Sequence, residues 1–161
     1  YRWHDTQNIK PLFAFGYGMS YTSFKLTNIK TDKKSYEAGE TINISCNVSN
    51  TGKTAGSEVV QIYVGKTNSM VERAEKELKA FQKIQLPRGK NSSVELSIDV
   101  DDLAFYDESI SNWNLEKGEY MIYVGTASNN IVKKETISIN WGAVIGTNQD
   151  TGFRIFYRKD R

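Results

Sequence analysis

The sequence predicts an all-β protein, an antiparallel β-sandwich of about seven strands preceded by an irregular N-terminal arm. Alternation of apolar and polar residues, the period of a strand with one buried face, is the dominant signal among seven short segments between residues 24 and 139. Clusters of Gly, Pro, Asn and Asp separate these segments at intervals of roughly 8 to 14 residues. No segment carries a sustained helical period, so long helices are not expected.

Length and composition fit one domain, or one domain with an arm. The chain has 161 residues, of which 39% are hydrophobic and 25% charged, and a chain of this size can bury a core without disulfides or a metal. No apolar run reaches the roughly 18 residues of a membrane span. The 21 basic and 19 acidic residues are interspersed, and the basic clusters at Lys33-Lys34 and near the C-terminus are short, which excludes a nucleic-acid binder.

The predicted strands follow one another with clear boundaries. In the second strand, Ile42, Ile44, Cys46 and Val48 alternate with polar residues, which puts the only cysteine on the buried face as a small apolar group. The fourth segment carries charges that suit a helix, but its alternation favours a strand that ends before Pro87. The strands are expected at residues 24–29, 41–48, 58–64, 75–86, 94–100, 119–124 and 131–139.

Seven alternating segments of this size are typical of a sandwich of the immunoglobulin or fibronectin type III kind. The cysteine–tryptophan–cysteine spacing of antibody domains is absent because Cys46 is the only cysteine, which favours the fibronectin type. Trp113 lies on the crossing before the sixth strand and is expected to fill the core there.

Aromatic residues are concentrated at the start of the chain. Seven of the 19 aromatic residues fall in the first 24 positions, without a helical or strand period. We therefore expect residues 1–22 to be an arm whose rings pack on a neighbouring domain, residues 23–139 to be the sandwich, and residues 140–161 to be an extension of unknown role with an added strand at 152–157. Because the chain opens on tyrosine rather than methionine, it is expected to be a piece of a longer protein. The expected interface residues of the arm are Tyr1, Trp3, Phe13, Phe15, Tyr17 and Tyr21.

The residue inventory does not support catalysis by this chain alone. Acidic residues cluster at one crossing, where a solvated turn is the favoured interpretation and a cation site or a carboxylate pair for acid–base catalysis are the alternatives. His4 is the only histidine, so neither a nucleophilic triad nor a zinc site can be assembled around it. No catalytic, cofactor or metal residue is predicted. The acidic cluster comprises Asp99, Asp101, Asp102, Asp107 and Glu108.

Several motifs, in order along the chain, resemble glycoside hydrolase family 3. The arm carries Tyr-Arg-Trp-His-Asp at residues 1–5 and Pro-Leu-Phe-Ala-Phe-Gly-Tyr-Gly-Met-Ser-Tyr-Thr at residues 11–22, similar to the junction that precedes the last domain of these enzymes. The resemblance continues through Asn-Thr-Gly-Lys at residues 50–53, Lys-Glu-Leu-Lys-Ala-Phe at residues 76–81 and Gly-Glu-Tyr-Met-Ile-Tyr-Val-Gly at residues 118–125. Ala14, Met19 and Ala80 replace the usual proline, leucine and glycine, and the last twenty or so residues match no family pattern.

The resemblance implies the C-terminal fibronectin type III-like domain of an exo-acting, retaining β-glucosidase or β-xylosidase. The family's nucleophilic aspartate and general acid belong to upstream domains and map onto no residue here. The implied partners are therefore the catalytic domains of the same polypeptide, and the implied location is secreted or periplasmic.

Two alternatives to a packing role remain open. A carbohydrate-binding module would use exposed rings to hold a polysaccharide, and a stand-alone adhesion domain would have no enzyme attached. Trp113 in its loop is one candidate for stacking on sugars, and the C-terminal extension supplies the others: Trp141, Phe153, Phe156 and Tyr157.

Overall fold

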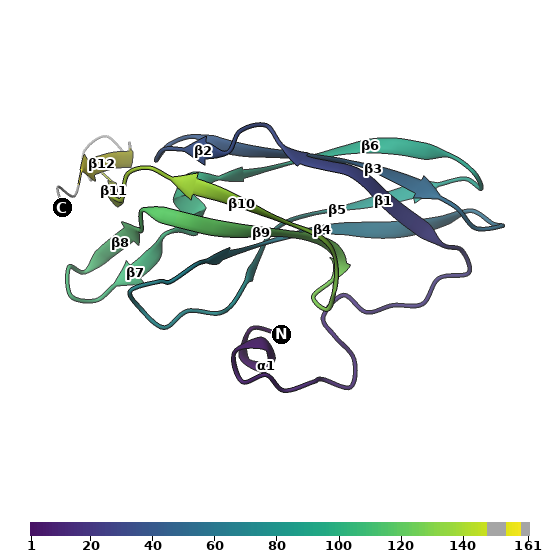
Figure 1. Ribbon diagram of the computed structural model, residues 1–161, viewed down its shortest axis with the longest axis horizontal. Coiled ribbons are helices and arrows are strands. Elements are labelled where there is room, and N and C mark those ends of the chain that lie inside the picture. The colour runs from purple at the N-terminus through teal and green to yellow at the C-terminus, as the bar shows by residue number, and fades with distance from the viewer. Residues whose placement is uncertain (148–153, 159–161) are drawn as a thin grey trace.

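The computed structural model describes residues 1–147 and 154–158, and within them twelve strands form two packed sheets and a smaller third sheet. Figure 1 shows the two layers, with the third sheet at one end of them. No helix within these residues has the length and apolar character to cross a membrane. The first sheet has the order β1 (Phe24–Thr31), β3 (Thr41–Asn50), β6 (Asn91–Asp99). The second has the order β2 (Ser35–Tyr36), β10 (Asn130–Ile139), β9 (Gly118–Ala127), β4 (Gly56–Lys66), β5 (Glu77–Leu86).

The predicted all-β sandwich is confirmed, because the seven long strands β1, β3, β4, β5, β6, β9 and β10 correspond to the seven predicted segments. The remaining strands are two to five residues long, too short to show a period in the sequence. One of them, β2, pairs in parallel with β10, so the chain crosses from the first sheet to the second directly after β1.

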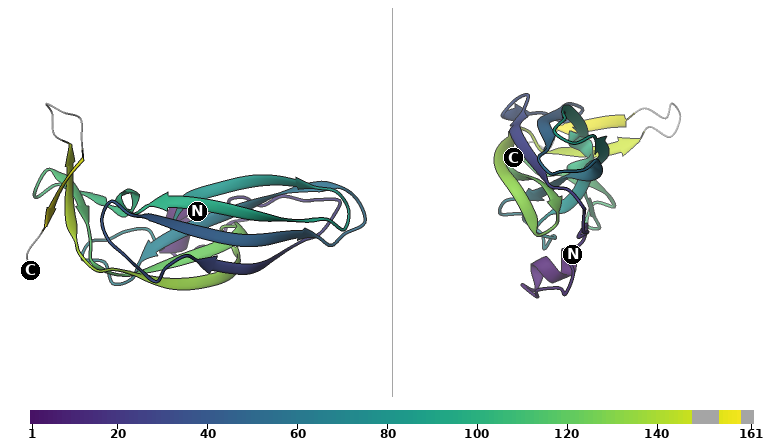
Figure 2. Two further views of the ribbon diagram at one scale, coloured as in Figure 1. Left: turned by 90° about the horizontal axis from the view of Figure 1, so that it is seen from above. Right: turned by 90° about the vertical axis from the view of Figure 1, so that its right-hand side faces the viewer.

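The third sheet has the order β12 (Arg154–Arg158), β11 (Ala143–Thr147), β8 (Asn112–Leu115), β7 (Phe105–Asp107). It combines a hairpin from the predicted irregular crossing with the C-terminal extension, since β11 pairs with β8 and β12 pairs with β11. Figure 2 shows this sheet projecting from one end of the sandwich. The added strand expected at residues 152–157 corresponds to β12 from Arg154 onward, and residues 152 and 153 lie outside the described residues.

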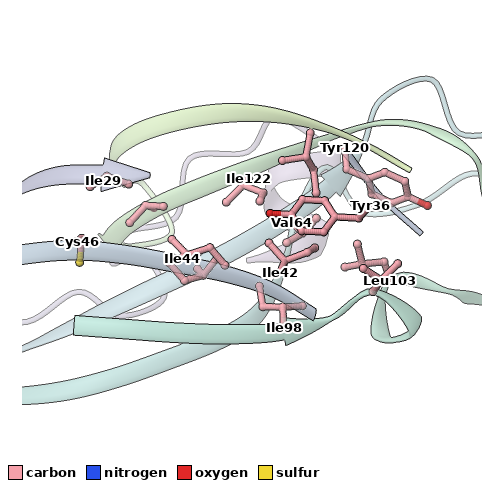
Figure 3. Close-up of a cluster of buried hydrophobic side chains, with 14 of the residues drawn as sticks. Ile29, Tyr36, Ile42, Ile44, Cys46, Val64, Ile98, Leu103, Tyr120 and Ile122 are labelled. Carbon is pink, nitrogen blue, oxygen red and sulfur yellow. The ribbon is translucent and has the colours of Figure 1, made fainter. Parts of the chain in front are cut away.

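The core lies between the inner faces of the first two sheets (Figure 3). Alternate residues of β3 point into it, including Ile42, Ile44 and Cys46, all nearly inaccessible to solvent. The buried position predicted for Cys46 is therefore confirmed, and burial raises the pKa of its thiol. The thiol packs as a small apolar group and stays protonated at neutral pH.

A tyrosine fixes the corner where the chain enters β9. The buried Tyr120 hydroxyl donates a hydrogen bond to the Glu116 carbonyl oxygen, four residues upstream, at 2.8 Å. A tyrosine bonded back to the preceding backbone at the corner before the penultimate long strand is a recurring feature of immunoglobulin-like sandwiches. Burial of Tyr120 also raises its pKa, so the phenol remains a hydrogen-bond donor.

The prediction that Trp113 fills the core is wrong. Its side chain is 52% exposed on β8, edge-on to Tyr106 with ring centroids 5.8 Å apart. The end of the core nearest this hairpin is already filled by Leu103 and Leu115 together with Tyr120, each at most 1% exposed. A close-packed interior has no space left there for an indole.

Asn50 joins four segments at the opposite end of the sandwich and is only 2% exposed. Its amide donates to the carbonyl oxygens of Thr54, at 2.8 Å, and Leu86, at 3.0 Å. Its side-chain oxygen accepts hydrogen bonds from the Thr22 hydroxyl and the Gly52 amide. The end of the arm, the β3–β4 turn and the end of β5 thus meet at one buried and fully paired side chain.

Asn50→Ala is expected to destabilise the domain by about 3 kcal/mol, because it leaves several buried donors and acceptors without partners, each costing roughly 1–3 kcal/mol. Urea unfolding of both proteins measures the change. Asn91→Ala, at an exposed position on β6, is the control and should change stability by less than about 0.5 kcal/mol. Equal effects of the two variants would contradict this role of Asn50.

Candidate functional site: the anchored arm and an aromatic cleft

The outer face of the second sheet is buried over its central strands β4 and β9, although no further sheet of the described residues covers it. Gln61 and Tyr63 on β4 and Tyr123 on β9 point away from the core, yet they are 4%, 0% and 9% exposed. The N-terminal arm supplies the cover. Figure 1 shows its helix α1 (Arg2–Thr6) outside the two layers, on the side of β4 and β9.

The start of the arm is fastened to the start of β5 by three successive contacts. The Tyr1 hydroxyl accepts a hydrogen bond from the Leu78 amide at 2.6 Å. Arg2 forms an ion pair with Glu77, and Asp5 forms one with Lys76 at 2.6 Å. The side chain of Lys76 is only 7% exposed, so removing Asp5 would break a largely buried ion pair, which is strongly destabilising. The Tyr1 ring also packs edge-on against Tyr63, with centroids 5.5 Å apart.

Glu77 is the centre of the charges in this contact. Its partial burial opposes ionisation, but the Lys79 ammonium and the guanidinium groups of Arg2 and Arg73 outweigh that effect and lower the pKa of Glu77. The carboxylate therefore remains charged at neutral pH and keeps both Arg2 and Lys79 as partners.

A second contact holds the middle of the arm. The Phe15 carbonyl oxygen accepts a hydrogen bond from the Ser128 amide at 2.9 Å, and Ala14 is buried. Gly16 follows with a φ of +81°. A Cβ at this position would overlap the side-chain amide of Gln61 and come within 3.2 Å of the Ala127 Cα. Glycine is required here for both its backbone conformation and its size.

Several hydrophobic side chains of the arm face outward. Of the six predicted interface residues, Tyr1 lies inward against Tyr63, and Phe15, which is 49% exposed, packs on Tyr1. Leu12 and Met19 are exposed as well and were not predicted, although Leu12 precedes Phe13 and Met19 lies midway between Tyr17 and Tyr21. We call the following residues the outer arm surface: Leu12 (90% exposed), Phe13 (65%), Tyr17 (55%), Met19 (92%) and Tyr21 (99%).

Trp3 lies apart from the outer arm surface, in a cleft of about 1330 Å³. One wall of the cleft is α1 with Trp3, and the other is the β7–β8 hairpin with Tyr106 and Trp113. Residues 71–74 of the β4–β5 loop also line it. We call this feature the aromatic cleft.

A buried carboxylate positions the loop that lines this cleft. Glu116 is 5% exposed and accepts hydrogen bonds from the Ser69 hydroxyl and the Met70 amide, both at 2.7 Å. Arg73 approaches the same carboxylate at 3.5 Å and donates to the Leu103 carbonyl oxygen at 3.0 Å. Sequence reasoning missed Glu116 and Arg73, because nothing in their spacing of 43 residues signals a contact.

Three members of the acidic cluster accept separate hydrogen bonds, of which only those of Asp107 lie within a turn. Asp101 accepts a bond from the Gly39 amide at 2.8 Å, and Asp99 accepts one from the Thr41 hydroxyl. Asp107 accepts bonds from the backbone and side chain of Ser109. Within residues 1–147 and 154–158, no three His, Cys, Asp or Glu side chains gather as a metal site. Asp107 fits the interpretation as a turn residue, whereas Asp101 is only 9% exposed and joins two segments far apart in the sequence.

Of the residues proposed from the sequence for glycan contact, Trp113 lines the aromatic cleft, and the others belong to the C-terminal extension. Trp141 is 49% exposed and does not line the aromatic cleft. Phe156 and Tyr157 belong to β12, and Phe153 falls outside the residues that the structure describes.

Comparison with known proteins agrees with this architecture. A family model described as "Fibronectin type III-like domain" matches residues 58–128. Thermostable β-glucosidase B of Acetivibrio thermocellus is 44% identical over 140 residues, which cover 87% of this chain and 18% of that protein. The structure of β-glucosidase 3B from Thermotoga neapolitana superposes with a TM-score of 0.81 at 36% identity, covering 89% of this chain and 19% of that one. The GH3 β-glucosidase of Bifidobacterium adolescentis gives a TM-score of 0.82 at 30% identity, covering 88% and 20%.

The fold, the tyrosine corner and these matches define the chain as a fibronectin type III-like domain. More particularly, it is similar to a part of GH3 β-glucosidases, and it spans about a fifth of the length of the relatives it matches.

Gly16→Ala is expected to loosen the arm, because a left-handed conformation costs a non-glycine residue about 1–2 kcal/mol and the added methyl overlaps Gln61. Limited proteolysis should cut the arm faster in this variant, and thermal melting should show lower stability. Gly18→Ala is the matched control, since a Cβ there meets no atom within 4 Å. Equal protease sensitivity of the two variants would contradict the close contact at Gly16.

Tyr63 is expected to make the domain sensitive to alkali. Burial, with the nearby Tyr1 and Asp5, raises the pKa of Tyr63 to about 12 from 10. The unfolded chain therefore loses the phenol proton first, and stability falls as the pH rises from 10 towards 12, by at most about 1.4 kcal/mol per pH unit.

Urea unfolding at pH 8, 10, 11 and 12 measures this dependence. Tyr63→Phe should have a shallower decline above pH 10 than the unaltered chain, whatever its starting stability. The other buried tyrosines are present in both proteins and cancel in the comparison. Parallel declines would show that Tyr63 does not carry the effect.

Proposed function

We propose that this chain is the non-catalytic fibronectin type III-like part of a family 3 glycoside hydrolase, an exo-acting β-glucosidase or β-xylosidase. Its role is to pack against the catalytic domains of the same polypeptide and to stabilise them. The observation that carries the proposal is the two-sided arm, anchored to the sandwich on one side and hydrophobic on the other.

The outer arm surface has the composition of a contact surface. Five large hydrophobic side chains between residues 12 and 21 are each more than half exposed, and the Phe13 and Tyr17 rings lie 5.2 Å apart. Soluble domains rarely leave a large apolar patch in water unless it meets a partner. Burying such a side chain fully contributes about 1.5–3 kcal/mol.

The anchored half of the arm holds the outer arm surface in a fixed position on the sandwich. The ion pair between Asp5 and Lys76 and the hydrogen bond between Phe15 and Ser128 hold the backbone at both ends of the segment that leads to the exposed rings. A surface held in place loses little conformational entropy when it binds. The arm can therefore hold the sandwich in a fixed position relative to the domain that it contacts.

Support for a non-catalytic role comes from the placement of the reactive side chains. His4 lies on α1 beside the Trp3 ring, with centroids 5.8 Å apart, and Cys46 is buried in the core. From the resemblance to family 3, we expect the nucleophile and the general acid to belong to other domains of the parent hydrolase. Secretion or periplasmic export remains a prediction from the same resemblance.

Combined substitution of Phe13, Tyr17 and Tyr21 by Ser tests the packing role. In the parent hydrolase, the triple variant should have a melting temperature several degrees lower. Each ring that is no longer buried removes about 2 kcal/mol of stabilising free energy. In the 161-residue chain alone, the same variant should melt like the unaltered chain, since these rings are exposed there. Unchanged melting of the parent enzyme would refute the packing role.

The mass of the native polypeptide separates this proposal from a stand-alone adhesion domain. An antibody against the chain should detect a band several times larger than 18.3 kDa in the source organism. A single band near 18.3 kDa would contradict the proposal.

A further inference from the structure

The aromatic cleft is not explained by packing within the domain, and the geometry points to a ligand for it. We propose that the cleft binds an oligosaccharide, with the Trp113 indole stacked against a sugar ring. This inference does not depend on the outer arm surface, which uses different residues.

Two aromatic rings of the β7–β8 hairpin are exposed and fixed in orientation, so they can stack on a ligand. Tyr106 and Trp113 face each other across the two strands and are each 52% exposed. Their edge-to-face contact fixes the indole without covering it. An aromatic platform held on paired strands loses little entropy on binding.

The opposite wall of the aromatic cleft also carries an exposed tryptophan. Trp3, on α1, is 63% exposed and lines the cleft with Trp113. The ion pair of Asp5 with Lys76 anchors the short helix that carries it. A pyranose ring has apolar C–H faces and a polar rim of hydroxyl groups, so it can pack flat against an indole while its rim meets polar walls.

The polar side chains of the cleft suit a neutral ligand with hydroxyl groups better than an anionic ligand. Gln7 and Asn112 contribute amides, and Asp102 and Glu108 contribute carboxylates. Carboxylates that accept hydrogen bonds from hydroxyl groups form the stronger, charge-assisted kind. The carboxylate residues that line the cleft outnumber its three basic residues: Glu72, Glu77, Asp101, Asp102, Asp107 and Glu108 against Arg2, Arg73 and Lys79.

The size of the cleft favours a chain of sugars over a single ring. Sites for ligands of drug size enclose about 300–1,000 Å³, whereas the aromatic cleft has about 1330 Å³. An extended oligosaccharide can contact both aromatic walls of a cleft this large. The proposed binding site therefore lies between α1 and the β7–β8 hairpin. It includes Trp113, which the sequence also suggested for sugar stacking, and leaves out the C-terminal aromatic residues.

Isothermal titration of the 161-residue chain with cellohexaose, xylohexaose and maltohexaose tests the proposal. At least one of the three should bind saturably, and Trp113→Ala should weaken that binding about tenfold or more. Trp3→Ala should also weaken it, and this variant leaves the hairpin intact if Trp113→Ala does not fold. Phe81→Ala is the control, because Phe81 on β5 is 65% exposed and does not line the cleft.

Two results would overturn the proposal. The first is the absence of binding by all three hexasaccharides at 10 mM, or binding that both Trp variants retain in full. The second is the same absence of binding, accompanied by a lower melting temperature of the parent hydrolase when Trp113 is replaced by Ala. The second result would assign the cleft to domain packing, and it would leave the proposed function of the outer arm surface standing.

Discussion

The two central strands of the five-stranded sheet, β4 and β9, carry buried side chains on both faces, and that constraint determines how the N-terminal arm is used. Inward side chains of β4 and β9 form the core, and outward ones such as Tyr63 and Tyr123 are as well buried as many core residues. A two-layer sandwich covers only one face of each sheet. The arm is therefore a third, partial layer that belongs to the fold, and the ion pair of Asp5 with Lys76 fastens it at the point where it begins.

This arrangement gives each motif of the arm a physical role. Residues 1–5 supply the ring, the ion pairs and the hydroxyl acceptor that join the arm to residues 76–78. Residues 14–16 lie against β4 and the β9–β10 turn, and Thr22 ends the arm at the buried Asn50. The side chains between these contacts have no place on the sandwich and face outward. A segment anchored at several points and hydrophobic on its free side is well suited to join one domain to the next.

The sequence predicted the parts of the fold that depend on local patterning. Strands of eight or more residues show their alternation, so β1, β3 and β6 could be located from the sequence, and the phase of β3 predicted the burial of Cys46. Short strands such as β7 and β8 have no readable period, so the position of Trp113 was misjudged. The pairing of Asp5 with Lys76 joins residues 71 positions apart and leaves no local signal. The near-continuous apolar runs at residues 59–64 and 120–124 did carry a signal, because strands buried on both faces lose their alternation.

Native-state hydrogen exchange on the intact chain tests most directly whether the arm is part of the fold. The Leu78 amide donates to the Tyr1 hydroxyl and the Ser128 amide donates to the Phe15 carbonyl oxygen, so the protection of both amides depends on the arm. We predict that both exchange slowly, in the same class as the amides in the centres of β4 and β9. Fast exchange at Leu78 and Ser128, with β4 and β9 still protected, would show that the arm leaves the sheet freely and would contradict this account.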